Sequence, residues 1–120
     1  MRQWMCDPRI MCRQHLLGEH VEHHMFVGTI NKGIDVTGYL TDNLLQPSSL
    51  ISRHEELVAE MERRGYKHKS PLPFIEFARL SPARRDVEID RPASLTELLR
   101  RCPECRARYD ALVASGELKA

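Results

Sequence analysis

The chain has 120 residues, of which 42% are hydrophobic and 29% charged, a composition typical of one globular domain. Its 18 Lys and Arg residues and 17 Asp and Glu residues leave a formal net charge of +1, so any nucleic-acid-binding surface must be local. The apolar stretches are far shorter than the roughly 20 residues that span a bilayer, and Met1–Pro8 lacks the apolar core of a signal peptide. We therefore expect a soluble intracellular protein whose four cysteines stay reduced or bind metal.

The first predicted helix runs from Ile10 to about Val27. It follows a break at Asp7–Pro8, and its apolar residues recur at three- and four-residue spacings. Gly28 stands where such a helix can stop. The next segment, Thr29–Pro47, mixes glycines with short β-branched pieces, which predicts an ordered loop with room for a short hairpin.

A second helix is predicted from Ser48 or Ser49 to Arg64. A serine is a favourable N-cap, and Gly65 stands where a left-handed C-terminal cap belongs. The segment Lys67–Pro92 contains four prolines and is expected to be a connector with at most one turn, around residues 74–78.

A third helix is predicted to begin at Ser94, because Ser94–Glu97 has the spacing of a capping box. Pro103 leaves two possibilities open. Either the helix ends near Arg101 and restarts, or Pro103 kinks it before it continues to Val113. The expected fold is all-α, with residues 1–120 forming one domain of three main helices and a long ordered loop between the first two.

One face of the first predicted helix carries polar residues around a glycine. His15, Gly18 and Glu22 share this face because they are spaced by three and four residues. A glycine costs a helix about 1 kcal/mol relative to alanine, which is tolerable where a backbone or ligand approaches closely. The break at Asp7–Pro8 allows Met1–Cys6 to fold back along this face. The simpler interpretation is a solvated face with a chance glycine.

Two stretches resemble the pyrimidine-dimer DNA glycosylases of the phage endonuclease V family. Gln14–Glu22 resembles the motif of that family's first helix, and His54–Tyr66 is similar to its second helix with an Arg-Gly-aromatic ending. The similarity covers roughly the first 70 residues, with a gap in the loop. It implies a small all-helical domain that excises a damaged pyrimidine and then nicks the strand as an abasic-site lyase.

The resemblance also implies the site residues. The family's nucleophile is the α-amino group of the chain, which here belongs to Met1, and its essential first-helix glutamate matches Glu22. His15 and Gln14 match motif positions, and Arg2 matches an arginine beside the terminal residue. We expect Met1, Glu22 and His15 to be catalytic.

These residue types suit such a reaction. An α-amine has an ordinary pKa of about 7.7 to 8.0, so part of it is neutral at physiological pH and can form an imine with a sugar carbon. A neighbouring carboxylate can stabilise the cationic sugar and then move protons during β-elimination. No catalytic cofactor or metal is expected. The activity would make the protein a DNA glycosylase and lyase that acts as a monomer on damaged double-stranded DNA, in the cytoplasm and nucleoid of a bacterial or phage-infected cell, away from membranes.

The sequence departs from the family where phosphate contacts are concerned. Val21 and Met25 stand where the family has first-helix arginines, and the aromatic, lysine-rich C-terminal tail linked to dimer recognition is missing. Other basic residues, together with Gln14, are therefore expected to contact DNA. They are Arg2, Arg13, Arg63, Arg64, Lys67 and Lys69, supplemented by Arg100, Arg101, Arg106 and Arg108.

A competing hypothesis comes from the cysteines. Cys102 and Cys105 have the C-x-x-C spacing that lets two thiolates bind one zinc ion, but a structural site needs four ligands and no second C-x-x-C exists. Candidates to complete it are Cys6, Cys12, His20, His23, His24, His54 and His68. The alternative function is a non-catalytic, zinc-stabilised nucleic-acid-binding protein; the alternative for the two cysteines is an inert buried pair. Trp4 could stack on an exposed base or anchor the N-terminal segment to the core.

Overall fold

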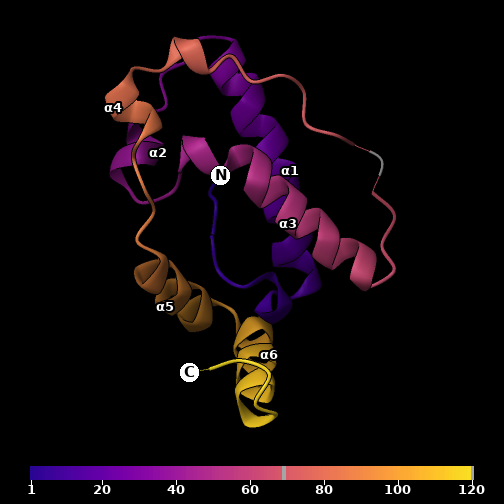
Figure 1. Ribbon diagram of the computed structural model, residues 1–120. Helices are drawn as coiled ribbons and strands as arrows, with labels where there is room; N and C mark the ends of the chain where they lie inside the picture. The colour runs from indigo at the N-terminus through magenta and orange to yellow at the C-terminus, as the bar shows by residue number, and fades with distance from the viewer. Residues whose placement is uncertain (69, 120) are drawn as a thin grey trace.

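The computed structural model describes residues 1–68 and 70–119, and all regular secondary structure in these residues is helical (Figure 1). The predicted all-α class is confirmed. Four of the helices are long, where the sequence suggested three. The α-helices are α1 (Arg13–Asn31), α2 (Thr37–Thr41), α3 (Leu50–Arg63), α4 (Pro82–Arg85), α5 (Arg91–Arg101) and α6 (Pro103–Ala114), and short 3₁₀ turns cover Pro8–Ile10, Pro47–Ser49 and Phe77–Arg79.

Helix α1 begins and ends later than its apolar pattern suggested. The 3₁₀ turn precedes it, and Cys12 is its N-cap. The prediction that it stops at Gly28 is wrong, because the buried apolar face continues through Ile30 and a single glycine only weakens a helix. The helix ends where Gly33 adopts a φ of 73°, a conformation that glycine reaches without strain.

The loop between α1 and α3 contains no strand in the described residues, so the hairpin expectation is wrong. Its β-branched residues instead precede and enter the short helix α2. Val36 is buried against the end of α1, which explains why an alternating pattern here does not produce a strand.

Helix α3 agrees well with its prediction. It follows a 3₁₀ turn at Pro47–Ser49 and ends at Arg63, and Gly65 has the expected positive φ, 84°. The connector after it holds two turns, the 3₁₀ turn Phe77–Arg79 and α4, where at most one was expected.

Helix α5 starts at Arg91, three residues before the predicted serine. The cap is Asp90, whose carboxylate accepts a hydrogen bond from the amide of Ala93 at 3.0 Å. Ser94 is buried inside the helix, and its hydroxyl donates to the carbonyl of Trp4 at 2.5 Å. At Pro103 the chain ends one helix and starts another, with Cys102 as the N-cap of α6.

The N-terminal segment lies beside α1 and runs opposite to it, then turns back at Pro8 (Figure 1). Gln3 is fully buried. Its backbone amide donates to the carbonyl of Leu44 at 2.8 Å, and its side-chain oxygen accepts from the backbone amide of Gln46 at 2.5 Å. Its side-chain nitrogen lies 3.1 Å from Nε2 of His23. The predicted folding back of Met1–Cys6 along the first helix is therefore confirmed.

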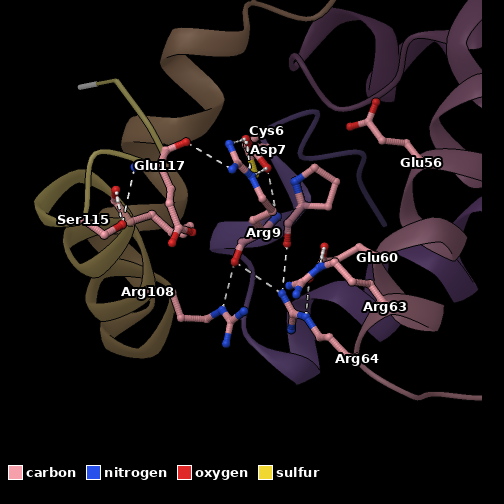
Figure 2. A network of polar contacts seen from close by, with 12 residues as sticks. Cys6, Asp7, Arg9, Glu56, Glu60, Arg63, Arg64, Arg108, Ser115 and Glu117 are labelled. Carbon is pink, nitrogen blue, oxygen red and sulfur yellow. Dashed lines mark hydrogen bonds and ion pairs between the residues drawn. The ribbon is translucent and has the colours of Figure 1, made fainter.

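The turn at Pro8–Ile10 is held by arginines from two helices (Figure 2). Arg64, at the end of α3, donates to the carbonyls of Pro8 and Met11 at 3.1 and 2.8 Å, and its Nε donates to Glu60 at 2.7 Å. Arg108 of α6 donates to the carbonyl of Arg9 at 3.1 Å. These contacts fix the point where the chain reverses into α1.

The core consists of two apolar clusters separated by a buried polar layer. One cluster surrounds Leu16 and Leu57, and the other surrounds Phe26 and Leu50. Between them, Arg53 of α3 forms a bidentate pair with Glu19 of α1, with distances of 2.7 and 2.9 Å, and both side chains are almost completely buried. The same guanidinium donates to the carbonyl of Cys6 at 2.7 Å, so the pair connects both helices to the N-terminal segment.

None of the helices in the described part of the chain combines the length and apolar character needed to cross a bilayer.

Replacing Arg53 with methionine should destabilise the fold by about 3–5 kcal/mol, because the Glu19 carboxylate would remain buried without its partner. Urea denaturation followed by circular dichroism measures the loss. Combining Arg53→Met with Glu19→Gln removes the unpaired charge and should restore part of the stability. A loss below about 1 kcal/mol for the single variant would contradict the central role given to this pair.

Candidate active site

The N-terminal residues and one face of α1 line a polar cleft of about 470 Å³. The three face residues predicted from helical spacing, His15, Gly18 and Glu22, all line it. The full lining is Met1, Arg2, Trp4, Gln14, His15, Gly18, Glu19, Glu22, Leu44 and Arg101. The structure thus brings together residues from the N-terminus, α1, the following loop and α5.

Glu22 is bound to the N-terminal segment by a hydrogen bond. The backbone amide of Arg2 donates to its Oε2 at 3.1 Å, and the carboxylate is partly buried. Covalent geometry places the α-nitrogen of Met1 roughly 3–4 Å from that amide nitrogen. The carboxylate is therefore bound one residue from the chain's first nitrogen, and Met1 lines the same cleft.

Gly18 leaves space in the cleft rather than accommodating a neighbouring backbone. A Cβ at this position would have no atom of the described residues within 4 Å apart from the local helix. The close approach expected from the sequence is therefore not made by the protein itself. The open space is available to a ligand.

Arg2 is held in place on the cleft wall. Its guanidinium lies 3.6 Å from the centroid of the Trp4 ring and donates to the hydroxyl of Ser94 at 3.2 Å. Burial, followed by repulsion from Arg101, lowers the pKa of Arg2 from its usual value. Trp4 is only 5% exposed and belongs to the core, which confirms its interpretation as an anchor.

His15 lies between the cleft and a group of cysteines. Its ring packs edge-on against Trp4, and its Nδ1 lies 3.2 Å from Sγ of Cys12 and 3.7 Å from Sγ of Cys105. Burial, followed by repulsion from Arg101, lowers the pKa of His15 below its usual value. Both effects favour the neutral imidazole.

Only some of the other residues predicted to contact DNA lie at the cleft. Gln14 lines the cleft, whereas Arg13 lies over the ring of Tyr66, 5.4 Å from its centroid. Arg63 is exposed but pairs with Glu60. Arg64 uses its donors to hold the Pro8–Ile10 turn (Figure 2). Lys67 is exposed, and Lys69 lies outside the described residues.

Two exposed apolar side chains replace the expected basic ones on α1. Val21 is 54% exposed and Met25 is 50% exposed. Neither can pair with phosphate. The basic side chains that line the cleft are Arg2 and Arg101, and Arg101 also pairs with Glu97 at 2.5 Å.

The structure also assembles two groups of metal-binding side chains that the sequence analysis did not recognise as sets. Cys12, His15, Cys102 and Cys105 form one, and His20, His24, His54 and His68 form the other. The signal missed for the first group was the spacing of Cys12 and His15, a C-x-x-H that matches the spacing of the C-x-x-C pair. Nothing in the sequence places the two motifs side by side.

A model of the pyrimidine dimer DNA glycosylase family matches residues 1–74, more than half of the chain and the part that contains Met1, Gly18 and Glu22. The chain belongs to this family. No curated protein and no solved structure is significantly similar to it. The family match ends before α4, so Ser94, Arg101 and the C-x-x-C pair lie in a part of the chain that it does not cover.

Replacing Gly18 with alanine should stabilise the fold by about 0.5–1 kcal/mol, because alanine is the better helix former and its methyl group meets no atom. The same methyl group would occupy the cleft, so glycosylase activity should fall. Thermal unfolding and single-turnover excision measure the two effects. A destabilised variant with unchanged excision would show that the glycine serves the helix and not the cleft.

Proposed function

We propose that the protein excises damaged pyrimidines, foremost pyrimidine dimers, through an imine formed by the α-amine of Met1, and then nicks the strand by β-elimination. The observation that carries this proposal is the hydrogen bond from the backbone amide of Arg2 to Glu22, which holds a carboxylate one residue from the N-terminal amine in an open cleft that Met1 also lines. Membership of the glycosylase family supports the class of reaction.

The chemistry needs an amine and a proton carrier. The neutral amine adds to C1′ of the damaged nucleotide while the bond to the base breaks, and the bonding electrons leave with the base. The nitrogen then loses a proton, the ring oxygen O4′ gains one, and the C1′–O4′ bond breaks as the nitrogen lone pair forms a cationic imine. Removal of a proton from C2′ expels the 3′-phosphate, which breaks the strand, and water finally releases the sugar from the amine.

Glu22 is assigned two tasks in this sequence. Its negative charge stabilises the cationic sugar as the base departs, and its oxygens accept and return the protons that the amine and C2′ release. Its bond to the Arg2 amide fixes the carboxylate relative to the chain's first residue. His15, in the same cleft, is the third catalytic residue of the proposal and contacts the sugar or the departing base.

Arg2 and Arg101 supply the positive charge for the neighbouring phosphates. Both line the cleft and flank Trp4, at 3.6 and 5.8 Å from its ring centroid. C1′ of the target nucleotide must be exposed to the amine, either by extruding a nucleotide or by bending the duplex. The substrate is therefore damaged double-stranded DNA, which the protein binds as a monomer in the cytoplasm or nucleoid.

The second candidate, a zinc-stabilised nucleic-acid-binding protein without catalysis, is favoured by the Cys12, His15, Cys102 and Cys105 group. Borohydride treatment on abasic DNA separates the two, because it reduces an imine to a stable bond and a protein that only binds DNA forms none. We favour the catalytic function. A bound zinc ion would be compatible with a glycosylase and with a protein that only binds DNA, whereas the hydrogen bond between Glu22 and the Arg2 amide is explained only by the glycosylase.

Blocking the α-amine of Met1 by acetylation, or by a tag that cannot be removed, should abolish borohydride trapping. DNA binding should change little, since the block removes one charge and no side chain. Trapping is measured on abasic duplex and binding by fluorescence anisotropy. Retained trapping would move the nucleophile to a lysine, with Lys67 and Lys69 as the first to test.

Changing Glu22 to Gln should lower excision on dimer-containing duplex by orders of magnitude, because the amide keeps the size of the side chain but carries neither charge nor a transferable proton. Some trapping on a pre-formed abasic site should persist, since the amine there attacks an aldehyde. Glu62→Gln, an exposed glutamate of α3 outside the cleft, is the matched control. If Glu22→Gln retains near-normal excision while His15→Ala loses excision, the role assigned to Glu22 is refuted.

DNA affinity should fall steeply with salt although the net charge is only +1, because the phosphate contacts are local. Arg2→Gln should reduce the slope of log affinity against log salt by about one. Arg79→Gln, which removes an exposed arginine outside the cleft, should leave it unchanged. Anisotropy at several salt concentrations gives the slope, and a flat response in the unmodified protein would rule out phosphate binding.

A further inference from the structure

Two helices begin at the same point in the molecule, each with a cysteine as its N-cap. Sγ of Cys12 accepts from the amide of His15 at the start of α1, and Sγ of Cys102 accepts from the amide of Cys105 at the start of α6. One turn into each helix stands a second ligand, His15 or Cys105. The four ligand atoms all lie within 4.8 Å of one another.

The spacing of these atoms fits a tetrahedral zinc site. Zinc bonds of about 2.3 Å to sulfur and 2.0–2.1 Å to nitrogen separate two sulfurs by about 3.8 Å, and a sulfur from a nitrogen by about 3.6 Å. In the structure, Sγ of Cys102 lies 3.8 Å from Sγ of Cys12. Nδ1 of His15 lies 3.2 and 3.7 Å from the sulfurs of Cys12 and Cys105.

Backbone amides and helix N-termini face the three sulfurs. Each accepts one backbone amide: Cys105 accepts from Cys12 at 3.2 Å, and the other two accept from within their own helices at 3.4 and 3.5 Å. The positive ends of two helix dipoles also point at the group. Amide hydrogen bonds of this kind orient metal ligands and stabilise their charge.

We propose that Cys12, His15, Cys102 and Cys105 bind one zinc ion. With four protein ligands the site is closed and structural, and it joins the start of α1 to the start of α6 across 90 residues of sequence. His15 would bind through Nδ1 and so keep its proton on Nε2. It could then donate a hydrogen bond into the cleft but could not serve there as a proton acceptor, which leaves proton removal to Glu22.

A second group stands on independent evidence, four buried histidine nitrogens that have no hydrogen-bond partner among residues 1–68 and 70–119. Nε2 of His20, His24, His54 and His68 is buried and unbonded in each case. A buried polar nitrogen without a hydrogen bond costs roughly 1–3 kcal/mol, so four together would remove much of the folding free energy of a small domain. In five of the six pairs the ring centroids lie 4.8 to 5.3 Å apart, which leaves no room for a layer of water between those rings.

The backbone explains why these rings meet. His20 and His24 are one turn apart on α1, His54 faces them from α3, and His68 follows the end of α3. At about 100° per residue, this face of α1 is turned well away from the face that carries His15 and Glu22. The group therefore lies apart from the catalytic cleft, and His54 and His68 line a different, mostly apolar cleft of about 600 Å³.

We infer that these four histidines hold a second zinc ion. Imidazole nitrogens suit zinc and neighbouring late transition metals, and one ion would satisfy all four unbonded nitrogens at once. The ion would fix the segment after α3 to the crossing of α1 and α3.

The test is the zinc content of the full chain, purified without a polyhistidine tag and passed through a column with a weak chelator. Elemental analysis and native mass spectrometry should find two zinc ions per chain. Cys105→Ser and His54→Gln should each retain one, and the double variant none. Cys6→Ser, a buried cysteine outside the group, and His23→Gln, the one histidine outside both groups, should retain both ions.

A measurement on the unmodified protein covers the case in which a variant fails to fold. X-ray absorption at the zinc edge should show three sulfur and five nitrogen ligands shared by two ions. Folded, metal-free protein with four titratable thiols would overturn both sites, and a disulfide between Cys12 and Cys102 would overturn the first. One ion with nitrogen ligands alone would also overturn the cysteine site, and one ion with three sulfurs and one nitrogen would overturn the histidine site.

Discussion

The buried pair of Glu19 and Arg53 is the interaction on which the rest of the structure depends. It lies between the two apolar clusters, where α1 and α3 are in contact, and the guanidinium also binds the carbonyl of Cys6. Desolvating two charges is costly, and that cost is offset only when both are fully paired, as they are here. The pair thereby admits one arrangement of the helices and the N-terminal segment. The cleft that Met1 and Glu22 line together depends on that arrangement.

Helix α1 serves several parts of the molecule because different faces of it meet different partners. One face lines the cleft through Gly18 and Glu22, and the next carries Glu19 into the polar layer. A third carries His20 and His24. The C-terminal helices support the cleft from outside the family-matched region, since Ser94 of α5 binds both the Arg2 guanidinium and the carbonyl of Trp4.

The sequence was sufficient for the features that depend on local periodicity. The extent of α3, its glycine terminator and the shared face of His15, Gly18 and Glu22 are all consequences of residue spacing along one helix. Local signals were misleading where tertiary contacts determine the structure. Ser94 has the pattern of an N-cap but is a buried hydrogen-bond partner inside α5. Helix α1 continues past Gly28 because the apolar residues around it are buried. The two metal-binding groups could not be predicted, because their members come together only when α1 packs against α3 and α6.

The central claim is that the chain's first nitrogen attacks the sugar. The most direct measurement is to trap the protein on abasic duplex with borohydride, digest the covalent complex and locate the sugar by peptide mass spectrometry. The account predicts a single modified peptide, carrying the adduct on the α-nitrogen of Met1. An adduct on a lysine side chain, or no covalent complex with protein that binds the same DNA, would contradict it.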